Sequence, residues 1–179
     1  MNRLLFLKKL SVFGIFSATN NTAKAQAIEN QLQANIIEAW QKSKTMTLTI
    51  VEQMPEECFG FKYTPEAMSF AEQFRHCAVY TYGQMAGRIK QKNPFEKGKP
   101  IVKLSKAETI EITTQLYDTV MGWAKNMSQE DLLKMTDFSG EPIPTWQLFQ
   151  AMENHIIHHR GQAIVYLRLN GITPKAYYG

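Results

Sequence analysis

The chain has 179 residues, of which 44% are hydrophobic and 20% are charged. This composition is typical of one folded globular domain and excludes a largely disordered chain. Two cysteines are too few for a disulfide scaffold or a four-thiolate zinc site, so any metal site must use histidine or carboxylate ligands. The net charge of +4 comes from residues 1–25, which hold four basic residues and no acidic one. The rest of the chain is neutral overall, so we expect no nucleic-acid binding.

Residues 1–25 have the pattern of an export signal. A basic start is followed by a short apolar run, and Ala23-Lys24-Ala25 is a cleavage site of the Ala-x-Ala type. The apolar run is well under the roughly 20 residues that cross a bilayer, so we expect no stable membrane span. We predict that this signal peptide is removed before Gln26 and that the mature protein is periplasmic or secreted. The alternative is an amphipathic helix that is retained in the mature protein.

Beyond the signal, apolar side chains recur at intervals of three and four residues, which is the pattern of amphipathic helices. Four long helices are predicted, over residues 28–54, 69–90, 105–123 and 145–171. Pro55 ends the first of them, the Asn93-Pro94 pair follows the second, and Gly171 ends the fourth. The sequence therefore predicts an all-α fold, a four-helix bundle with a longer crossover connection, as a single domain over residues 26–179.

Shorter signals refine the boundaries of these elements. Ser105 is the expected N-cap of the third helix, because Glu108 follows it at the spacing of a capping box. A short helical turn is predicted to begin at Ser128, and residues 140–144 are predicted to form a loop. No pair of strands is predicted.

The candidate functional residues are histidines. Three of the four in the chain, His155, His158 and His159, lie close together on the fourth predicted helix. The i, i+4 spacing of His155 and His159 places both rings on one helix face. His76 lies in the middle of the second predicted helix, and a bundle brings facing helices to within about 10 Å. We therefore predict a divalent metal site of His76, His155 and His159 with an open coordination position, as in catalytic sites.

The histidine pair has an alternative interpretation, because such pairs also occur by chance on solvated helix faces. The surrounding helix is mostly apolar, and buried imidazoles without partners cost on the order of a few kcal/mol, which favours a metal or a hydrogen-bond network. Ile156 stands where HExxH metalloproteases have their catalytic glutamate, so that class is excluded. His158 is predicted to be a surface residue or to act outside the ligand set, and Cys77 is predicted to lie in the core.

Other polar residues are candidates for supporting roles. The expected catalytic group is a metal-bound water, with Gln162 and Tyr166 as candidate helpers because they continue the stripe of the histidine pair. The alternative for Tyr166 is a packing aromatic ring with a solvated hydroxyl. Arg160 is predicted to fix a loop or a helix end through an acidic partner. Glu72 either orients the ring of His76 or is solvated.

The motifs of the chain also carry a family resemblance. Residues 154–162 and 166–174 resemble the C-terminal helix signature of the DinB/YfiT-like superfamily. Residues 68–76 are similar to the second-helix motif of that superfamily, and residues 128–132 to the turn between helices. The resemblance covers roughly residues 27–175.

The resemblance implies an up-up-down-down four-helix bundle, often dimeric, with a divalent metal, commonly zinc or nickel. Carried over residue by residue, the metal ligands are His76, His155 and His159. The implied function is that of a metal-dependent enzyme, a hydrolase or a thiol-dependent transferase, that acts on a small-molecule substrate as a homodimer. Since reducing thiols are scarce outside the cytoplasm, export favours hydrolysis. The alternative is a non-catalytic metal-binding bundle that acts in binding or dimeric assembly.

Overall fold

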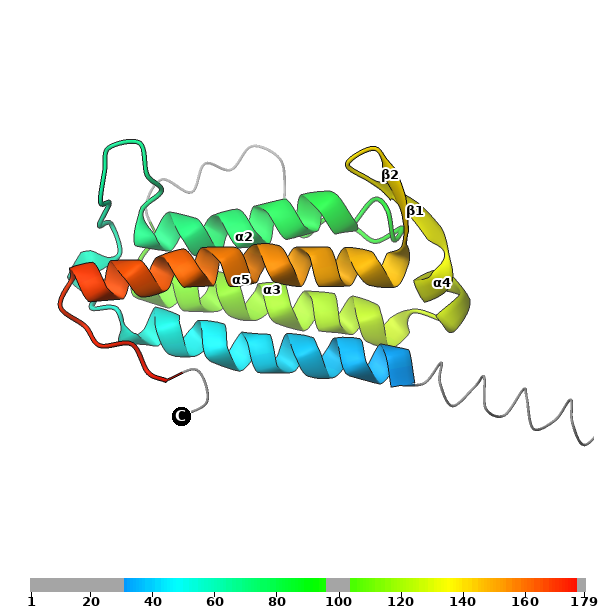
Figure 1. Ribbon diagram of the computed structural model, residues 1–179, viewed down its shortest axis with the longest axis horizontal. Helices are drawn as coiled ribbons and strands as arrows, with labels where there is room; N and C mark the ends of the chain where they lie inside the picture. The colour runs from blue at the N-terminus through cyan, green and yellow to red at the C-terminus, as the bar shows by residue number, and fades with distance from the viewer. Residues whose placement is uncertain (1–30, 96–103, 177–179) are drawn as a thin grey trace, which may run out of the picture.

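The computed structural model describes residues 31–95 and 104–176. Four long helices lie side by side in it (Figure 1). They are the N-terminal helix, described over residues 31–53, and α2 (Phe70–Met85), α3 (Lys106–Asn126) and α5 (Thr145–Leu169). The shorter elements are the 3-10 helix η1 (Glu56–Cys58), the helix α4 (Gln129–Leu133) and the antiparallel strands β1 (Met135–Phe138) and β2 (Glu141–Pro144). The predicted signal peptide and the predicted start of the first helix lie outside the described residues.

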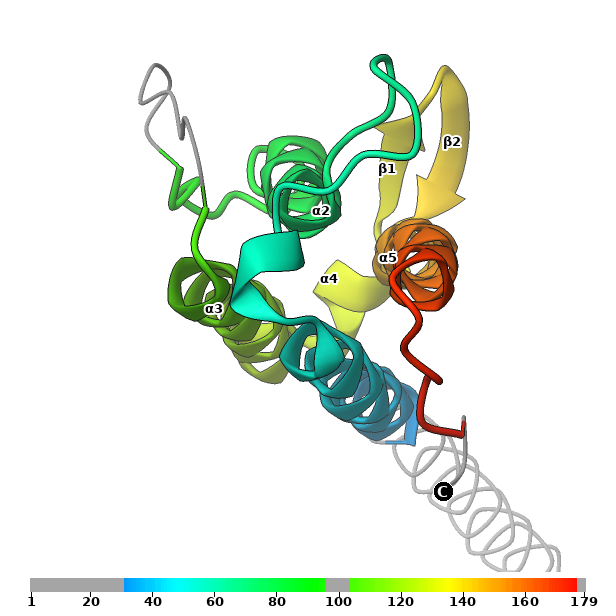
Figure 2. The same ribbon diagram turned by 90° about the vertical axis from the view of Figure 1, so that its left-hand side faces the viewer.

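The prediction of a four-helix bundle with a longer crossover is confirmed. Seen along the bundle, α2 lies next to α3 and α5, and the N-terminal helix completes the square (Figure 2). The C-terminal end of the N-terminal helix lies beside the start of α3, where Glu56 accepts the backbone N–H of Lys106. At the opposite end, Gln33 donates to the carbonyl of Met127 just after α3. The N-terminal helix and α3 are therefore antiparallel.

The order of helix directions differs from the one that the resemblance implied. The N-terminal helix and α5 run one way, and α2 and α3 run the other way (Figure 1), so the order is up-down-down-up instead of up-up-down-down. The physical reason lies in the connections. Residues 54–69 form a short connection, which makes the N-terminal helix and α2 antiparallel, whereas the longer connection between α2 and α3 allows these two helices to run in the same direction.

Three helices begin with the same local signal, a capping box. In each, a serine side chain accepts the backbone N–H of the residue three positions later, and the acidic side chain of that residue accepts the N–H of the serine. The pairs are Ser69 with Glu72, Ser105 with Glu108 and Ser128 with Asp131. Each cap satisfies backbone donors that the first helical turn leaves unpaired and stabilises its helix by about 1 kcal/mol. The predicted starts at Ser105 and Ser128 are confirmed.

Two boundaries differ from the prediction. The second helix ends at Met85, and residues 86–90 form turns in place of its last predicted stretch. The predicted loop at residues 140–144 instead contains β2, which pairs with β1 across the two-residue turn Ser139-Gly140. Both turn residues have positive φ, 59° and 86°, which is the conformation that joins hairpin strands most tightly. The two prolines of β2 concealed the strand, because proline cannot donate to a ladder.

The core fills the space between the helices with large apolar side chains. Trp40, Tyr82, Tyr117, Leu148 and Phe149 belong to one cluster, and Phe59, Phe70, Phe74, Tyr166 and Leu167 belong to a second. Cys77 is buried among the first cluster, as predicted, and burial raises the pKa of its thiol to about 12. Within residues 31–95 and 104–176, no helix is both long and apolar enough to span a bilayer.

Candidate metal centre

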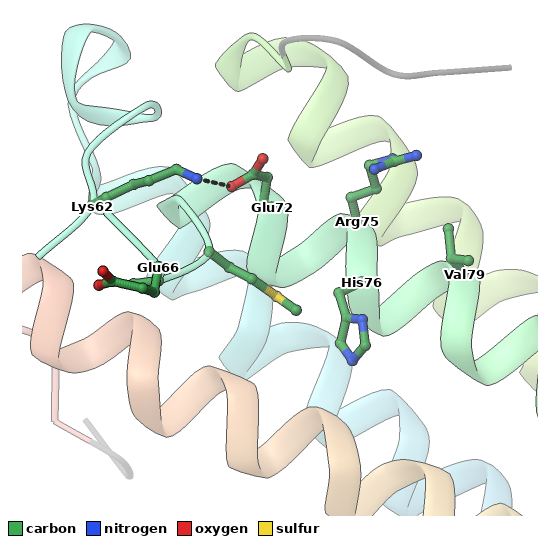
Figure 3. A pocket seen from close by; sticks show the side chains of 8 residues that line it. Lys62, Glu66, Glu72, Arg75, His76 and Val79 are labelled. Atoms are coloured by element: carbon green, nitrogen blue, oxygen red, sulfur yellow. Dashed lines mark ion pairs between the residues drawn. The ribbon is translucent and has the colours of Figure 1, made fainter. Parts of the chain in front are cut away.

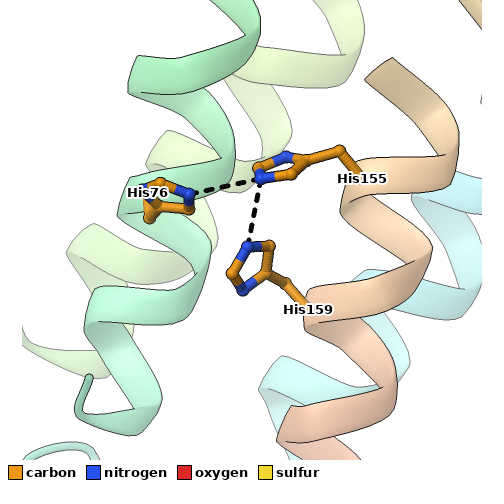
Figure 4. Close-up of side chains that lie close together, drawn as sticks. All are labelled: His76, His155 and His159. Atoms are coloured by element: carbon orange, nitrogen blue, oxygen red, sulfur yellow. Dashed lines mark hydrogen bonds between the residues drawn. The ribbon is translucent and has the colours of Figure 1, made fainter. Parts of the chain in front are cut away.

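Three imidazole rings converge between α2 and α5 (Figure 4). The Nε2 atom of His155 lies 3.2 Å from Nε2 of His76 and 3.1 Å from Nε2 of His159. The candidate ligand atoms of all three residues lie within 4.8 Å of one another. The structure thus brings together the three histidines that the sequence nominated, and their cluster could hold a metal ion.

The helices account for this convergence. His155 and His159 are one turn apart on α5, so their rings leave the same face of that helix. His76 comes from the facing side of α2, which packs antiparallel to α5. The ring of Tyr80, one turn after His76, stacks on the ring of His155 with centroids 4.3 Å apart. Packing therefore holds the rings in place before any ion binds.

The electrostatic surroundings keep these rings neutral. Burial, together with the charges of the neighbouring histidines, lowers the pKa of His155 and of His159 to about 4. Burial also lowers the pKa of His76. A neutral imidazole keeps a nitrogen lone pair free for coordination, whereas a protonated one does not. Three neutral nitrogens form a donor set that suits a borderline divalent ion such as zinc or nickel.

These pKa shifts predict how the stability of the metal-free protein depends on pH. A histidine has a pKa near 6.5 when unfolded, and in the folded protein His155 and His159 titrate at about 4. Between these values the unfolded chain binds more protons, so the free energy of unfolding should fall as the pH drops from about 6.5 towards 4. Denaturant titrations across this range test the slope. The double variant His155→Phe with His159→Phe should show a shallower slope, and an equal slope would contradict the assignment.

A glutamine that the sequence analysis did not single out contacts one of these rings. The side chain of Gln73 on α2 is only 2% exposed, and its Oε1 atom lies 2.5 Å from Nδ1 of His159. Gln73 precedes His76 by three residues and therefore shares its helix face. This spacing is the signal in the sequence that could have identified it. By contrast, Nδ1 of His155 is buried and has no hydrogen-bond partner among the described residues.

The centre borders a surface pocket with a volume of about 330 Å³. His76 lies at one side of this pocket, and its ring points towards α5 (Figure 3). Met68 and Val79 are among the apolar lining residues, and Lys62 is among the charged ones. Within the described ranges, no carboxylate or thiol joins the three histidines. A tetrahedral ion on three nitrogens would therefore keep one position for a water or a substrate.

The candidate helpers Gln162 and Tyr166 each hydrogen-bond to a partner other than the three converging histidines. His158 is exposed, as predicted, and its Nε2 lies 2.7 Å from Nε2 of Gln162. Gln162 is thus engaged by His158 on the outer side of α5. Tyr166 is fully buried, and its hydroxyl donates to the carbonyl oxygen of Met68. Its role is that of a packing aromatic residue with a bonded hydroxyl instead of a solvated one.

Of the two alternatives for Glu72, the structure shows the solvated one, because Glu72 is exposed. Glu72 does not contact His76: its carboxylate accepts the backbone N–H of Ser69 and pairs with Lys62 at 3.1 Å (Figure 3). The capping position of Glu72 explains this, because it directs the side chain back to the helix start.

Arg160 crosses to the middle of the N-terminal helix, where it donates to the side chains of Ser43 and Thr47. It also interacts electrostatically with the acidic side chain of Glu153.

Comparisons with known proteins agree with this fold. The DinB family model matches residues 21–179. The uncharacterized protein YjoA of Bacillus subtilis (strain 168) is 23% identical over 150 residues, which are 80% of this chain and 94% of the relative. The crystal structure of a DinB-like protein from Bacillus cereus ATCC 10987 matches with a TM-score of 0.68 and 19% identity, over 79% of this chain and 94% of that one. The crystal structure of the DinB-like YjoA from Bacillus subtilis matches with a TM-score of 0.64 and 20% identity, over 80% and 97%.

Proposed function

The chain belongs to the DinB family, and on that premise we propose that it is a metal-dependent enzyme that acts on a small molecule. The single observation that carries the proposal is the convergence of three neutral imidazole nitrogens beside a surface pocket. We propose His76, His155 and His159 as the ligands of a zinc or nickel ion. Hydrolysis is the reaction that we favour, with thiol-dependent transfer as the other outcome of the assays below.

The three histidines would hold the ion from two helices. His155 and His159 would hold the ion from α5, and His76 would close the set from α2. A divalent ion held there supplies Lewis acidity and activates water near neutral pH. The low pKa of the histidines supports ligand binding, because protons do not compete for their lone pairs at neutral pH.

The pocket gives a direction for the substrate. Because His76 is both a candidate ligand and a lining residue, a molecule in the pocket would approach the centre along the His76 side. Met68 and Val79 offer apolar contact, whereas Arg75 and the ion-paired Lys62 offer charge to a polar group. We therefore expect a substrate that is small and has both an apolar part and a polar part.

The export signal and the dimer also remain proposals. We propose that residues 1–25 are removed during export; most of this segment precedes residue 21, where the DinB match begins. Intact-mass measurement of protein from the native host tests this, and retention of Met1 would refute it. We further propose a homodimer, which light scattering of the purified protein tests.

The function is tested by turnover of the metal-reconstituted protein. We expect hydrolysis in a panel of esters and amides, and a parallel panel of low-molecular-weight thiols with electrophiles tests the transferase reaction. The matched control is the same protein after metal removal, which should lose turnover. Absent turnover in every panel, with one ion bound per chain, would contradict an enzymatic role and favour a non-catalytic metal-binding bundle.

A further inference from the structure

A chain of buried hydrogen bonds runs from the backbone of Met68 to the candidate metal centre. It starts at the carbonyl oxygen of Met68, a group that accepts hydrogen bonds and never donates them. The hydroxyl of Tyr166 donates to this oxygen at 2.5 Å. A hydroxyl has one hydrogen, so towards any other neighbour the oxygen of Tyr166 acts as an acceptor.

Gln73 is the next link of this chain. Its Nε2 atom donates to the hydroxyl oxygen of Tyr166 at 3.4 Å, which orients the amide nitrogen towards Tyr166. The amide oxygen of Gln73 consequently faces His159, 2.5 Å from Nδ1. An amide oxygen accepts hydrogen bonds only, so Nδ1 of His159 must carry the hydrogen.

We propose that the path Met68–Tyr166–Gln73 fixes His159 in its Nδ1–H tautomer and so directs the lone pair of Nε2 into the metal centre. Gln73 is thereby a positioning residue: it acts on the centre through His159 and does not coordinate. The inference rests on the proposed function in one respect, since the Nε2 lone pair would act as a ligand only if the centre binds a metal. Isolated histidine in water favours the Nε2–H tautomer, so the protein must impose the other one.

The opposite direction of this series of hydrogen bonds is disfavoured at its Tyr166 end. If the amide of Gln73 were turned over, its oxygen would face the oxygen of Tyr166, whose hydrogen is already given to Met68. The amide N–H would donate to Nδ1 of His159, which would put a hydrogen on Nε2, the atom that lies 3.1 Å from His155. Each unsatisfied buried polar group costs about 1–3 kcal/mol. Gln73 and Tyr166 are both almost completely buried, so solvent cannot replace the lost bonds.

The tautomer is directly measurable in the metal-free protein. NMR spectra of protein with ¹⁵N-labelled histidine, recorded at mildly alkaline pH, distinguish a ring nitrogen with a hydrogen from one without. We expect His159 to show hydrogen on Nδ1 and a lone pair on Nε2. A spectrum with the hydrogen on Nε2 would overturn the proposal.

Variants of Gln73 separate this role from simple packing. Gln73→Met keeps the length of the side chain but removes the acceptor, so the Nδ1–H tautomer should be lost and zinc affinity should fall about 10- to 100-fold. Gln73→Glu keeps an acceptor and should retain the tautomer. The matched control is Thr81→Val, which removes a buried hydroxyl from the same helix without touching His159. If Gln73→Met left both the tautomer and the affinity unchanged, the proposal would be wrong.

A second variant keeps the test decisive if Gln73→Met fails to fold. Tyr166→Phe retains the ring and removes the hydroxyl that orients Gln73, so His159 should then show a mixture of both tautomers. An unchanged single tautomer in Tyr166→Phe would overturn the proposed hydrogen-bond path. Since all these spectra are recorded without metal, an Nδ1–H tautomer in a protein that binds neither zinc nor nickel would support the hydrogen-bond path and contradict the proposed function.

Discussion

Replacing either His155 or His159 with alanine should abolish zinc binding, whereas His158→Ala should leave it unchanged. Each of the first two substitutions removes one of three converging nitrogens and leaves two, one on α2 and one on α5. The affinity should therefore fall by more than the roughly 100-fold that the loss of an orienting neighbour costs. Calorimetric titration of the metal-free variants with zinc measures the change.

His158 is the matched control for this experiment, because it is a histidine on the same helix with its ring on another side. It is exposed, lies 2.7 Å from Gln162, and packs edge-on against the ring of His159 with centroids 5.0 Å apart, but it is not one of the three converging ligand candidates. Circular dichroism verifies that each variant keeps its helices. Equal loss of zinc binding in all three variants would show that the ligand face of α5 is assigned wrongly.

Replacing Arg160 with methionine should destabilise the protein by about 3 kcal/mol. The guanidinium group of Arg160 is buried, with only 4% of the residue exposed, and it donates to the side chains of Ser43 and Thr47 on the N-terminal helix. Both hydroxyls also bond to the hydroxyl of Tyr117 on α3, at 3.1 and 2.8 Å. The network joins three helices, and the substitution removes the buried donor that Ser43 and Thr47 accept from, so these hydroxyls keep only their bonds to Tyr117. Equilibrium unfolding in denaturant measures the change.

The control for Arg160 lies two turns further along the same helix. Arg168 is exposed, so Arg168→Met should change the free energy of unfolding by less than about 0.5 kcal/mol. Zinc affinity should be unchanged in a folded Arg160→Met protein, because the guanidinium group faces the N-terminal helix and not the centre. Equal stability of the two variants would contradict the structural role of Arg160.

The helices could be predicted because their signals are local. Apolar spacing, the Ser105 capping box and the Gly171 stop act within a few residues of where they occur. The hairpin could not be predicted in this way, since Pro142 and Pro144 argue against a strand on their own. The Ser139-Gly140 turn determines the hairpin that these prolines concealed. The order of helix directions depends on how the chain between α2 and α3 crosses the bundle, which no local pattern encodes.

The candidate centre was predictable to the extent that histidine is rare and its spacing is informative. The pair on α5 follows from the helical repeat, and His76 follows from the packing of a bundle. Gln73 was not identified, because an amide gains its role from the ring that it happens to face across the interface. The hydroxyl partners of Arg160 were not identified for the same reason. The sequence shows that Arg160 is charged, but only the packing of the helices shows that its guanidinium group donates to hydroxyls of the N-terminal helix.

The three candidate ligand histidines are unevenly distributed along the chain. His155 and His159 are neighbours in any helical state of their segment, but His76 is 79 residues away from His155. An ion bound by all three histidines would act as a removable cross-link between α2 and α5. The unfolded chain would have to close a long loop to form this cross-link, whereas the folded bundle already holds the three histidines close together. Tight capture of metal would accordingly be a property of the assembled tertiary structure and not of the His155–His159 segment alone.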